Sequence, residues 1–266
     1  MTAPHWYRPG GDAVVPHAVV LAEMARAPVV LLGETHDRAD IHRWQLHVAA
    51  GLLARREVVL GFEMFPARLD PVLADWVAGR LSEEAFLERA EWGEVWGFPA
   101  ELYLPLFRFC RDTGTRMIGL NCRRGLVREV GKGGWDSVPE ADREGLTPAR
   151  PSSEPYRRFI FDLARGVPQE RRGADALSPE FTRFIRAQEV WDRSFATRIA
   201  GAVEVGGPLV VGIIGKGHLQ FSGGVSWQLA DLGVTGAMVA VTERAGAAHL
   251  EEGAADYVAV LPGGDA

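Results

Sequence analysis

Two short motifs of the same form, Gly-x-x-His, occur at residues 33–36 and 215–218, and each directly follows an apolar run. Such runs are typical of buried strands, so both histidines are expected just beyond strand ends. A third apolar run ends in the same way, on Glu63. Two histidines and one carboxylate are a ligand set that suits a metal ion with open coordination positions. The sequence therefore predicts a metal or catalytic site made of His36, Glu63 and His218.

Three polar residues are candidates for catalytic support. Glu34 is either a general base or hydrogen-bond partner of a ligating histidine, or a carboxylate favoured by the dipole of the next helix. Gln188 and Asp192 lie four residues apart within an apolar helical stripe, where polar side chains need partners. They either make hydrogen bonds within the core or point into the site. The opposite side of the same helix is predicted to carry three arginines: Arg183, Arg186 and Arg193.

Further polar residues are candidates for binding a cofactor. Tyr103 carries a phenol, which is a known ligand type for haem iron, although such a tyrosine also commonly packs with one hydrogen bond. Asn121 ends an apolar run and is expected near the histidines. His42 and His47 lie off or at the margin of the apolar face of their helix. The pattern therefore predicts surface positions for both, from which they could still reach a cofactor near His36.

Each residue of the predicted site also has a purely structural interpretation. His36 and His218 could each cap a helix or lie in a loop. Glu63 could form a salt bridge, because a carboxylate beside apolar neighbours must be paired, ligating or protonated. Gly33 and Gly215 favour a shared site, since glycine allows tight turns and close backbone approach at the end of a strand.

The composition excludes several classes of function. The chain has 266 residues, a net charge of -6 and a pI near 5.7, which predicts neither nucleic acid nor an anionic membrane as a partner. Two cysteines are too few for a disulfide framework. Residues 1–16 contain no apolar leader and no cysteine that could carry a lipid, and no stretch is long enough to span a membrane. We therefore expect a cytoplasmic protein.

The alternation of apolar runs and helical patterns predicts an α/β fold with a mainly parallel central sheet flanked by helices. Strands are predicted at residues 28–33, 58–63, 115–120, 209–214, 235–242 and 255–260. Helices are predicted at residues 37–56, 69–79, 82–90 and 101–112. Sites in open α/β sheets form beyond the carboxyl ends of the strands. One edge of the sheet should therefore carry Glu34, His36, Glu63, Asn121 and His218.

The middle of the chain departs from this alternation. Residues 131–155 are rich in Gly, Pro, Ser and charge, which predicts a long loop. Residues 156–204 have helical patterns and form a predicted insertion between the third and fourth core strands. We expect residues 1–266 to form one domain that includes this loop and insertion, residues 131–204.

Several motifs together resemble one known family. In chain order they are Leu-Leu-Gly-Glu-Thr-His-Asp, Gly-Phe-Glu-Met-Phe, Gly-Leu-Asn, Ala-Gln-x-x-Trp-Asp and Gly-x-Gly-His. They extend over roughly residues 28–240 and resemble the ChaN-like family, within the wider Tiki and erythromycin-esterase superfamily. Each motif alone is weak, and their combination and order carry the resemblance.

The resemblance implies two different functions. ChaN-like members are haem-binding proteins linked to iron uptake that dimerise around haem, so the first possibility is a haem- or iron-binding protein and possible homodimer. Superfamily relatives are metal-dependent proteases or hydrolases that use two Gly-x-x-His motifs and a Glu. By similarity, the metal or catalytic set would be His36, Glu63 and His218.

The second possibility is therefore a hydrolase that uses iron, zinc or manganese on a small molecule or peptide. Its bound water would be activated with Glu34 or Asp192 as base. Whether the protein is an enzyme is left open between the two possibilities. No nucleotide site is expected, because Lys216 is followed by Gly217 and not by the Ser or Thr of a phosphate-binding loop. The serine-hydrolase motif Gly-x-Ser-x-Gly does not occur either.

Overall fold

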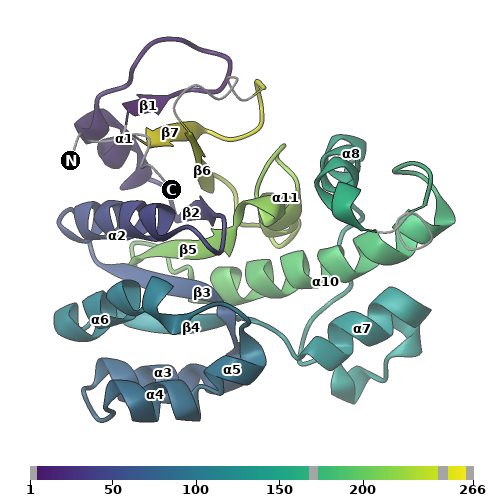
Figure 1. Ribbon diagram of the computed structural model, residues 1–266, viewed down its shortest axis with the longest axis horizontal. Coiled ribbons are helices and arrows are strands. Elements are labelled where there is room, and N and C mark those ends of the chain that lie inside the picture. Colours follow the sequence, from purple (N-terminus) through teal and green to yellow (C-terminus); the bar gives the residue numbers. More distant parts are fainter. Residues whose placement is uncertain (1–4, 168–172, 245–250, 262–266) are drawn as a thin grey trace.

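The computed structural model describes residues 5–167, 173–244 and 251–261. Their centre is a seven-stranded sheet in the order β1-β7-β6-β2-β5-β3-β4 (Figure 1). β1 runs antiparallel to β7, and the other neighbouring strands are parallel. The strands are β1 (His5–Tyr7), β2 (Val29–Glu34), β3 (Val58–Pro66), β4 (Arg116–Asn121), β5 (Leu209–Gly215), β6 (Met238–Arg244) and β7 (Tyr257–Leu261).

The predicted α/β fold with a mainly parallel sheet is confirmed, and the six predicted strands are present with ends that differ by a few residues. β1 was not predicted, because three residues are too few to show the alternation of a strand. Trp6 fixes β1 to the body of the protein. Its ring is fully buried, and its indole N–H donates a hydrogen bond to His17 Nδ1 at 2.9 Å.

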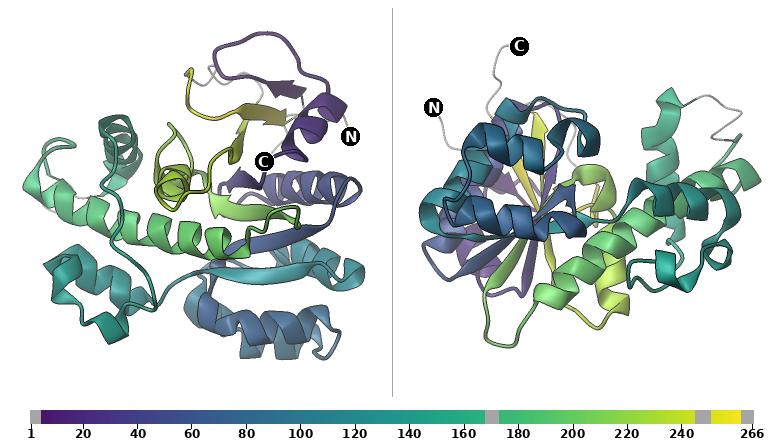
Figure 2. Two further views of the ribbon diagram at one scale, coloured as in Figure 1. Left: turned by 180° about the vertical axis from the view of Figure 1, so that it is seen from behind. Right: turned by 90° about the horizontal axis from the view of Figure 1, so that it is seen from below.

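The two faces of the sheet bury separate apolar cores. Along β2, Val30 and Leu32 belong to one core and Val29 and Leu31 to the other, as the alternation of side chains along a strand requires. Helices cover both faces (Figure 2). The first core is covered by α1 (His17–Met24), α2 (Ala39–Leu53), α3 (Asp70–Val77), α4 (Glu83–Arg89), α5 (Trp92–Val95) and α6 (Leu104–Thr113). The second is covered by α10 (Pro179–Ala202) and α11 (Gly224–Asp231).

Between β4 and β5 the chain forms α7 (Arg124–Gly133), α8 (Glu154–Leu163) and then α10. The long loop expected at residues 131–155 is shorter than predicted, since its first residues end α7 and its last begin α8. The glycines at the end of α7 hid this helix, because glycine disfavours helix interiors. The first half of α10 lies between α7 and α8, beyond the edge of the sheet (Figure 1).

α10 begins as its sequence predicts, with the Ser178 side chain accepting a hydrogen bond from the Phe181 N–H. The prediction that Arg193 lies on a side of this helix away from the core is wrong. Arg193 is 5% exposed and donates a hydrogen bond to Asp231 at 2.7 Å, because α11 covers that side of α10. Among the described residues, no helix is long and apolar enough to cross a membrane.

Candidate functional site

Three neighbouring parallel strands bring the predicted residues to one edge of the sheet. β2 ends at Glu34, which lies in register with Gly215 at the end of β5. β3 pairs with the other side of β5 and carries Glu63. β5 leads directly into the short helix η6 (Lys216–His218). Both Gly-x-x-His motifs and Glu63 therefore meet at the carboxyl edge of the sheet, where sites form in this fold class.

The first motif belongs to a hydrogen-bonded network that we call the His36 arm: His36, Glu34, Tyr103 and His42. His36 Nδ1 lies 2.6 Å from Glu34 Oε1, and the Tyr103 hydroxyl donates to the same oxygen at 3.0 Å. His42 Nδ1 lies 3.2 Å from Glu34 Oε2. The Tyr103 hydroxyl also donates to the His36 carbonyl oxygen at 3.2 Å. The buried carboxylate of Glu34 thus orients the His36 ring.

The second motif belongs to a similar network that we call the His218 arm: His218, Asp192, Tyr156 and Gln188. His218 Nδ1 lies 2.6 Å from Asp192 Oδ1, and the Tyr156 hydroxyl donates to Asp192 Oδ2 at 3.0 Å. Gln188 Nε2 lies 2.9 Å from His218 Nδ1 and donates to the Tyr156 hydroxyl at 3.2 Å. Each arm therefore joins a tyrosine, a buried carboxylate and a histidine in the same order.

Glu63 lies between the two arms. Its Oε2 accepts a hydrogen bond from the Gly215 N–H at 2.5 Å, and its Oε1 lies 3.7 Å from His218 Nε2. A Cβ atom at Gly215 would lie 3.2 Å from His36 Nε2 and 3.3 Å from Glu63 Oε2. Each histidine uses Nδ1 to contact its own carboxylate, so its Nε2 is free to face Glu63. We call His36, Glu63 and His218 the centre. Glycine at position 215 keeps the space between these groups open.

The His36 arm stabilises its own charges. Burial by itself raises the pKa of Glu34, but hydrogen bonds from His36 and His42 outweigh burial, and the pKa is lowered. Burial by itself lowers the pKa of His36, but the Glu34 hydrogen bond and the charge of Glu63 outweigh burial, and this pKa is raised. Glu34 raises the pKa of His42 against burial in the same way. The arm therefore favours a carboxylate beside protonated imidazoles.

The charge balance of the His218 arm is different. Burial raises the pKa of Asp192, and the opposing charge and hydrogen bond of His218 do not overcome it. Burial lowers the pKa of His218, but Asp192 and then Glu63 outweigh burial, and this pKa is raised. Burial and the neighbouring Asp192 raise the pKa of Tyr156, so its hydroxyl keeps its proton and acts as a donor.

The structure places the other predicted residues around the centre. Tyr103 is fully buried with its hydroxyl bonded within the His36 arm, so its oxygen is not open to a cofactor. The Asn121 amide donates to the carbonyl oxygen of Glu63 at 3.0 Å and so ties β4 to β3. The predicted surface position of His42 is wrong. His42 is 2% exposed, because the carboxylate of Glu34 compensates for burying the ring.

Tyr156 is the residue of the site that the sequence reasoning missed. It lies on α8, and its ring packs against the loop that follows the second motif. A Cβ atom at Gly223 would lie 2.3 Å from the Tyr156 ring, and one at Gly224 would lie 2.0 Å from the His218 carbonyl oxygen. The Gly-Gly pair at residues 223–224 was the available signal, because adjacent glycines in a loop allow a close approach of other groups to the backbone.

The donor types of the centre suit a transition metal, since two imidazoles and one carboxylate are common ligands. Within the described ranges, however, no group of three or more His, Cys, Asp or Glu side chains is arranged to hold a metal ion. The predicted metal site of His36, Glu63 and His218 therefore stays a prediction.

The protein is therefore an α/β protein in which two histidine arms meet at the carboxyl edge of a mainly parallel sheet. Residues 20–229 match the family described as "Haem-binding uptake, Tiki superfamily, ChaN". The match covers most of the chain, so this protein belongs to that family, as the resemblance of its motifs predicted. No curated protein matches the sequence.

Several solved structures are similar. ChaN of Campylobacter jejuni, whose structure shows cofacial haem binding, is 15% identical with a TM-score of 0.71 over 97% of this chain and 96% of that chain. The type III effector HopBA1 is 14% identical with a TM-score of 0.53 over 98% and 97%. A mutant of the erythromycin esterase EreC is 13% identical with a TM-score of 0.41 over 98% and 83%, too distant to support an argument. At these identities the likeness shows the fold alone.

Proposed function

We propose that this protein binds haem and that His36 is the side chain that coordinates the haem iron. Membership of a haem-binding family supports the choice of ligand. The exposure of the candidate donors supports the choice of residue. The His36 side chain is 31% exposed and the His218 side chain 12%, whereas Tyr103 is fully buried. Histidine is a common ligand of haem iron.

The surroundings of His36 fit this role. The ring of Trp96 lies 4.9 Å from that of His36, and the ring of Phe98 lies 5.1 Å from it, which provides aromatic surface for a porphyrin. Glu34 fixes the orientation of the His36 ring through Nδ1 and makes the ring a stronger base. Bound haem would supply an iron that accepts an imidazole nitrogen. Tyr103 and His42 act one step further out, by holding Glu34 in place.

A haemin titration of the purified protein tests this proposal. We expect a saturable complex with a sharp Soret band that His36→Ala weakens strongly and Tyr103→Phe leaves nearly unchanged. Tyr103→Phe is the matched control, because it alters the same arm without removing the proposed ligand. A complex that survives His36→Ala but is lost in Tyr103→Phe would overturn the assignment of the ligand. The lack of any saturable complex would overturn haem binding itself.

A second candidate function is hydrolysis at the same centre, and one specific observation favours it: Nε2 of each oriented histidine is left for Glu63. In this reaction Glu63 would accept a proton from water, and His218 would donate a proton to the leaving group. Activity against small esters and peptides that Glu63→Gln abolishes, with the fold intact, would support it. Activity unchanged in Glu63→Gln would exclude it for this centre. A single domain, a homodimer and a cytoplasmic location also stay predictions.

A further inference from the structure

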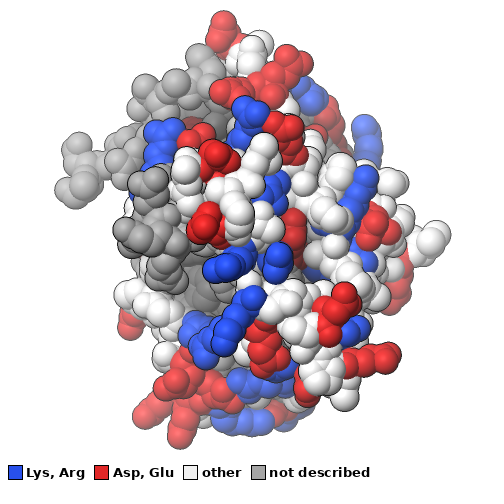
Figure 3. Space-filling view, turned by 90° about the vertical axis from the view of Figure 1, so that its right-hand side faces the viewer, with Lys and Arg blue, Asp and Glu red and all other residues white. Residues whose placement is uncertain are grey.

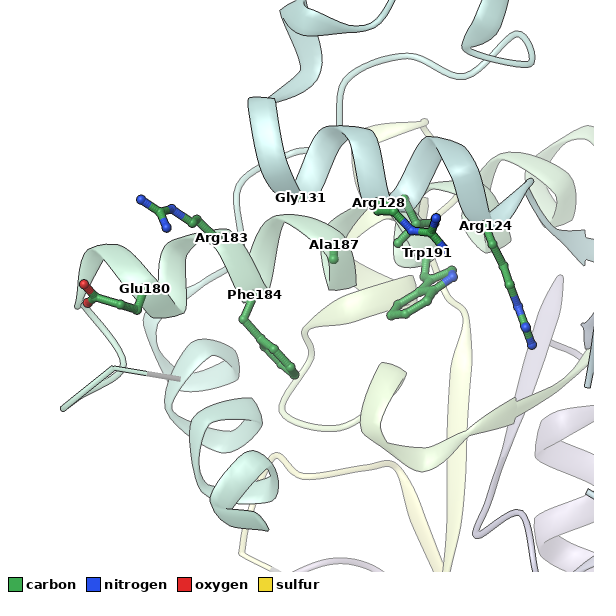
Figure 4. A pocket seen from close by; sticks show the side chains of 9 residues that line it. Arg124, Arg128, Gly131, Glu180, Arg183, Phe184, Ala187 and Trp191 are labelled. Atoms are coloured by element: carbon green, nitrogen blue, oxygen red, sulfur yellow. The ribbon is translucent and has the colours of Figure 1, made fainter. Parts of the chain in front are cut away.

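A groove of about 530 Å³ lies between α7 and α10, beyond the edge of the sheet. Its volume is in the range of small-molecule sites. Arg124 and Arg128 line it from α7, while Phe184, Trp191 and Arg183 line it from α10 (Figure 4). Neither Gly-x-x-His motif contributes to this lining. The groove is therefore a separate feature from the His36, Glu63 and His218 centre.

The spacing of residues along both helices explains why the groove exists. Gly131 of α7 packs against Ala187 of α10, and a Cβ atom at Gly131 would lie 3.3 Å from the Ala187 Cβ. These small residues let the two helices approach closely. Phe184 and Trp191 lie three residues before and four residues after Ala187, so they share its face of α10. The larger side chains therefore flank the close contact and form the apolar part of the groove.

The apolar part of the groove adjoins the His218 arm. Phe184 and Trp191 are both half-buried and project from the same side of α10 (Figure 4). The Trp191 ring meets the His218 ring edge-on, with centroids 6.2 Å apart. A ligand that contacts Trp191 in the groove would thus lie one aromatic ring away from a histidine of the centre.

The charged part of the groove is mainly cationic. Arg124 donates a hydrogen bond to the carbonyl oxygen of Val95. Arg128 and Arg183 make no ion pair or hydrogen bond with any residue that the structure describes, and the acidic side chain in the lining is Glu180. The face at this end of α7, α8 and α10 shows Lys and Arg gathered near its middle (Figure 3). Planar guanidinium groups pair well with carboxylates.

We propose that this groove binds a carboxylate ligand with a flat aromatic body. Phe184 and Trp191 contact the aromatic body, and Arg128 and Arg183 pair with the carboxylates. Haem is one such ligand and would link the groove to the proposed function; a smaller aromatic carboxylate is another. The inference rests on the proposed function only if the ligand is haem.

Binding of two iron-free probes tests this proposal. Protoporphyrin IX has a large flat ring and two carboxylates, and pyrenebutyrate is a smaller aromatic carboxylate. Neither can coordinate His36 through iron, so the dependence of binding on the arginines of the groove reports on the groove itself. We expect the double substitution Arg128→Glu and Arg183→Glu to raise the Kd of a bound probe roughly tenfold or more. Arg186→Glu is the matched control, because Arg186 lies on the same helix outside the groove lining, and its effect should be below about twofold.

The outcomes separate the two possible sources of the ligand. Binding of protoporphyrin IX alone supports a porphyrin groove, and binding of both probes supports a site for aromatic carboxylates in general. Failure of both to bind, or a Kd that the double variant leaves unchanged, overturns the proposal. Circular dichroism checks whether the variants fold. If the double variant does not fold, the single variant Arg128→Glu, at an exposed position, replaces it in the binding measurement.

The same experiments separate this proposal from the proposed function. Haemin binding that is lost in His36→Ala, with no effect of the arginine changes on protoporphyrin IX, would retain haem binding and reject the groove. Protoporphyrin IX binding that depends on the arginines, with a haemin spectrum unchanged in His36→Ala, would retain the groove and reject His36 as the ligand.

Discussion

The His36 arm and the His218 arm have the same parts but differ in exposure and in charge balance. In both arms a tyrosine hydroxyl donates to a buried carboxylate, and that carboxylate holds Nδ1 of a histidine at 2.6 Å. The His36 side chain is 31% exposed, whereas the His218 side chain is 12% exposed. The lowered pKa of Glu34 contrasts with the raised pKa of Asp192.

The reason for this contrast is the number of cationic partners. Glu34 has two histidines beside it, His36 and His42, while Asp192 has His218 alone among the described residues. A second cation therefore offsets the burial of one carboxylate but not of the other. One arrangement of side chains can therefore serve two purposes. In the proposed function the His36 arm presents an oriented histidine to haem, whereas the His218 side chain is mostly buried.

The largest expected effect comes from removing each histidine. His218→Ala should lower the free energy of unfolding by about 3 kcal/mol, because Asp192 is left buried without its cationic partner. His36→Ala should cost only about 1 kcal/mol, because Glu34 keeps His42 and Tyr103. Urea unfolding monitored by circular dichroism measures both. Equal losses would contradict the difference between the arms.

The next largest effect is expected from replacing the carboxylate of each arm, Glu34 or Asp192. A lowered pKa means that Glu34 contributes stability above its ordinary value of 4.5 and that this stability is lost as pH falls through the folded-state pKa. Asp192 has a raised pKa, so its charged form is disfavoured by folding. At neutral pH we expect Glu34→Gln to cost about 2 kcal/mol and Asp192→Asn about 1 kcal/mol or less.

Acid titration of these two variants sharpens the test. The deficit of Glu34→Gln relative to the unmodified protein should shrink as pH falls through the lowered folded-state pKa of Glu34, which thermal unfolding at a series of pH values would record. A deficit of Asp192→Asn that shrinks in the same pH range would remove the contrast between the carboxylates.

A smaller effect is expected from closing the space between the arms. Gly215→Ala would place a Cβ atom 2.9 Å from His36 Cε1, so a side chain must shift, at a cost of about 1 kcal/mol. Haemin affinity should fall because the His36 ring is displaced. Gly201→Ala is the matched control, since a Cβ atom there meets nothing within 4 Å, and it should leave haemin affinity unchanged. Isothermal titration calorimetry would measure the haemin affinity of both variants. Equal haemin affinities would contradict the claim that Gly215 keeps the space beside His36 open.

The smallest effect is the dependence of stability on alkaline pH. The pKa values of His36 and His218 are raised above 6.5, so their pairing contributes stability that is fully present below 6.5 and is lost as pH rises through the folded-state values. Thermal unfolding should therefore show a melting temperature that decreases across this range. The double variant His36→Ala and His218→Ala should show a flatter dependence, and an unchanged slope would argue against paired histidines.

The sequence predicted the sheet well, because the strands of a parallel sheet are continuous apolar runs such as residues 209–214. It also predicted that the carboxyl edge collects Glu34, Glu63 and His218, because the direction of parallel strands decides where their ends lie. β1 and α7 could not be predicted. β1 is too short to show the alternation of polar and apolar residues, and α7 ends in glycines, which normally argue against a helix.

The arms themselves were predicted only in part. The positions of Gln188 and Asp192 in an apolar stripe indicated that they needed partners, and the structure shows those partners. Tyr156 and the burial of His42 depend on how separate helices pack together, which local patterns do not contain. His42 in particular has the sequence environment of a surface residue, and its burial depends on a carboxylate from a neighbouring strand.

The most direct test of the account is the tautomer of each histidine, measured by long-range ¹H–¹⁵N correlation NMR on protein labelled with ¹⁵N-histidine. Above the raised pKa values, we expect His36 and His218 both to carry their proton on Nδ1, with Nε2 unprotonated and free to face Glu63 or a ligand. His5, which is exposed, provides a reference signal. A proton on Nε2 of either His36 or His218 would contradict the claim that two carboxylates orient two histidines toward one centre.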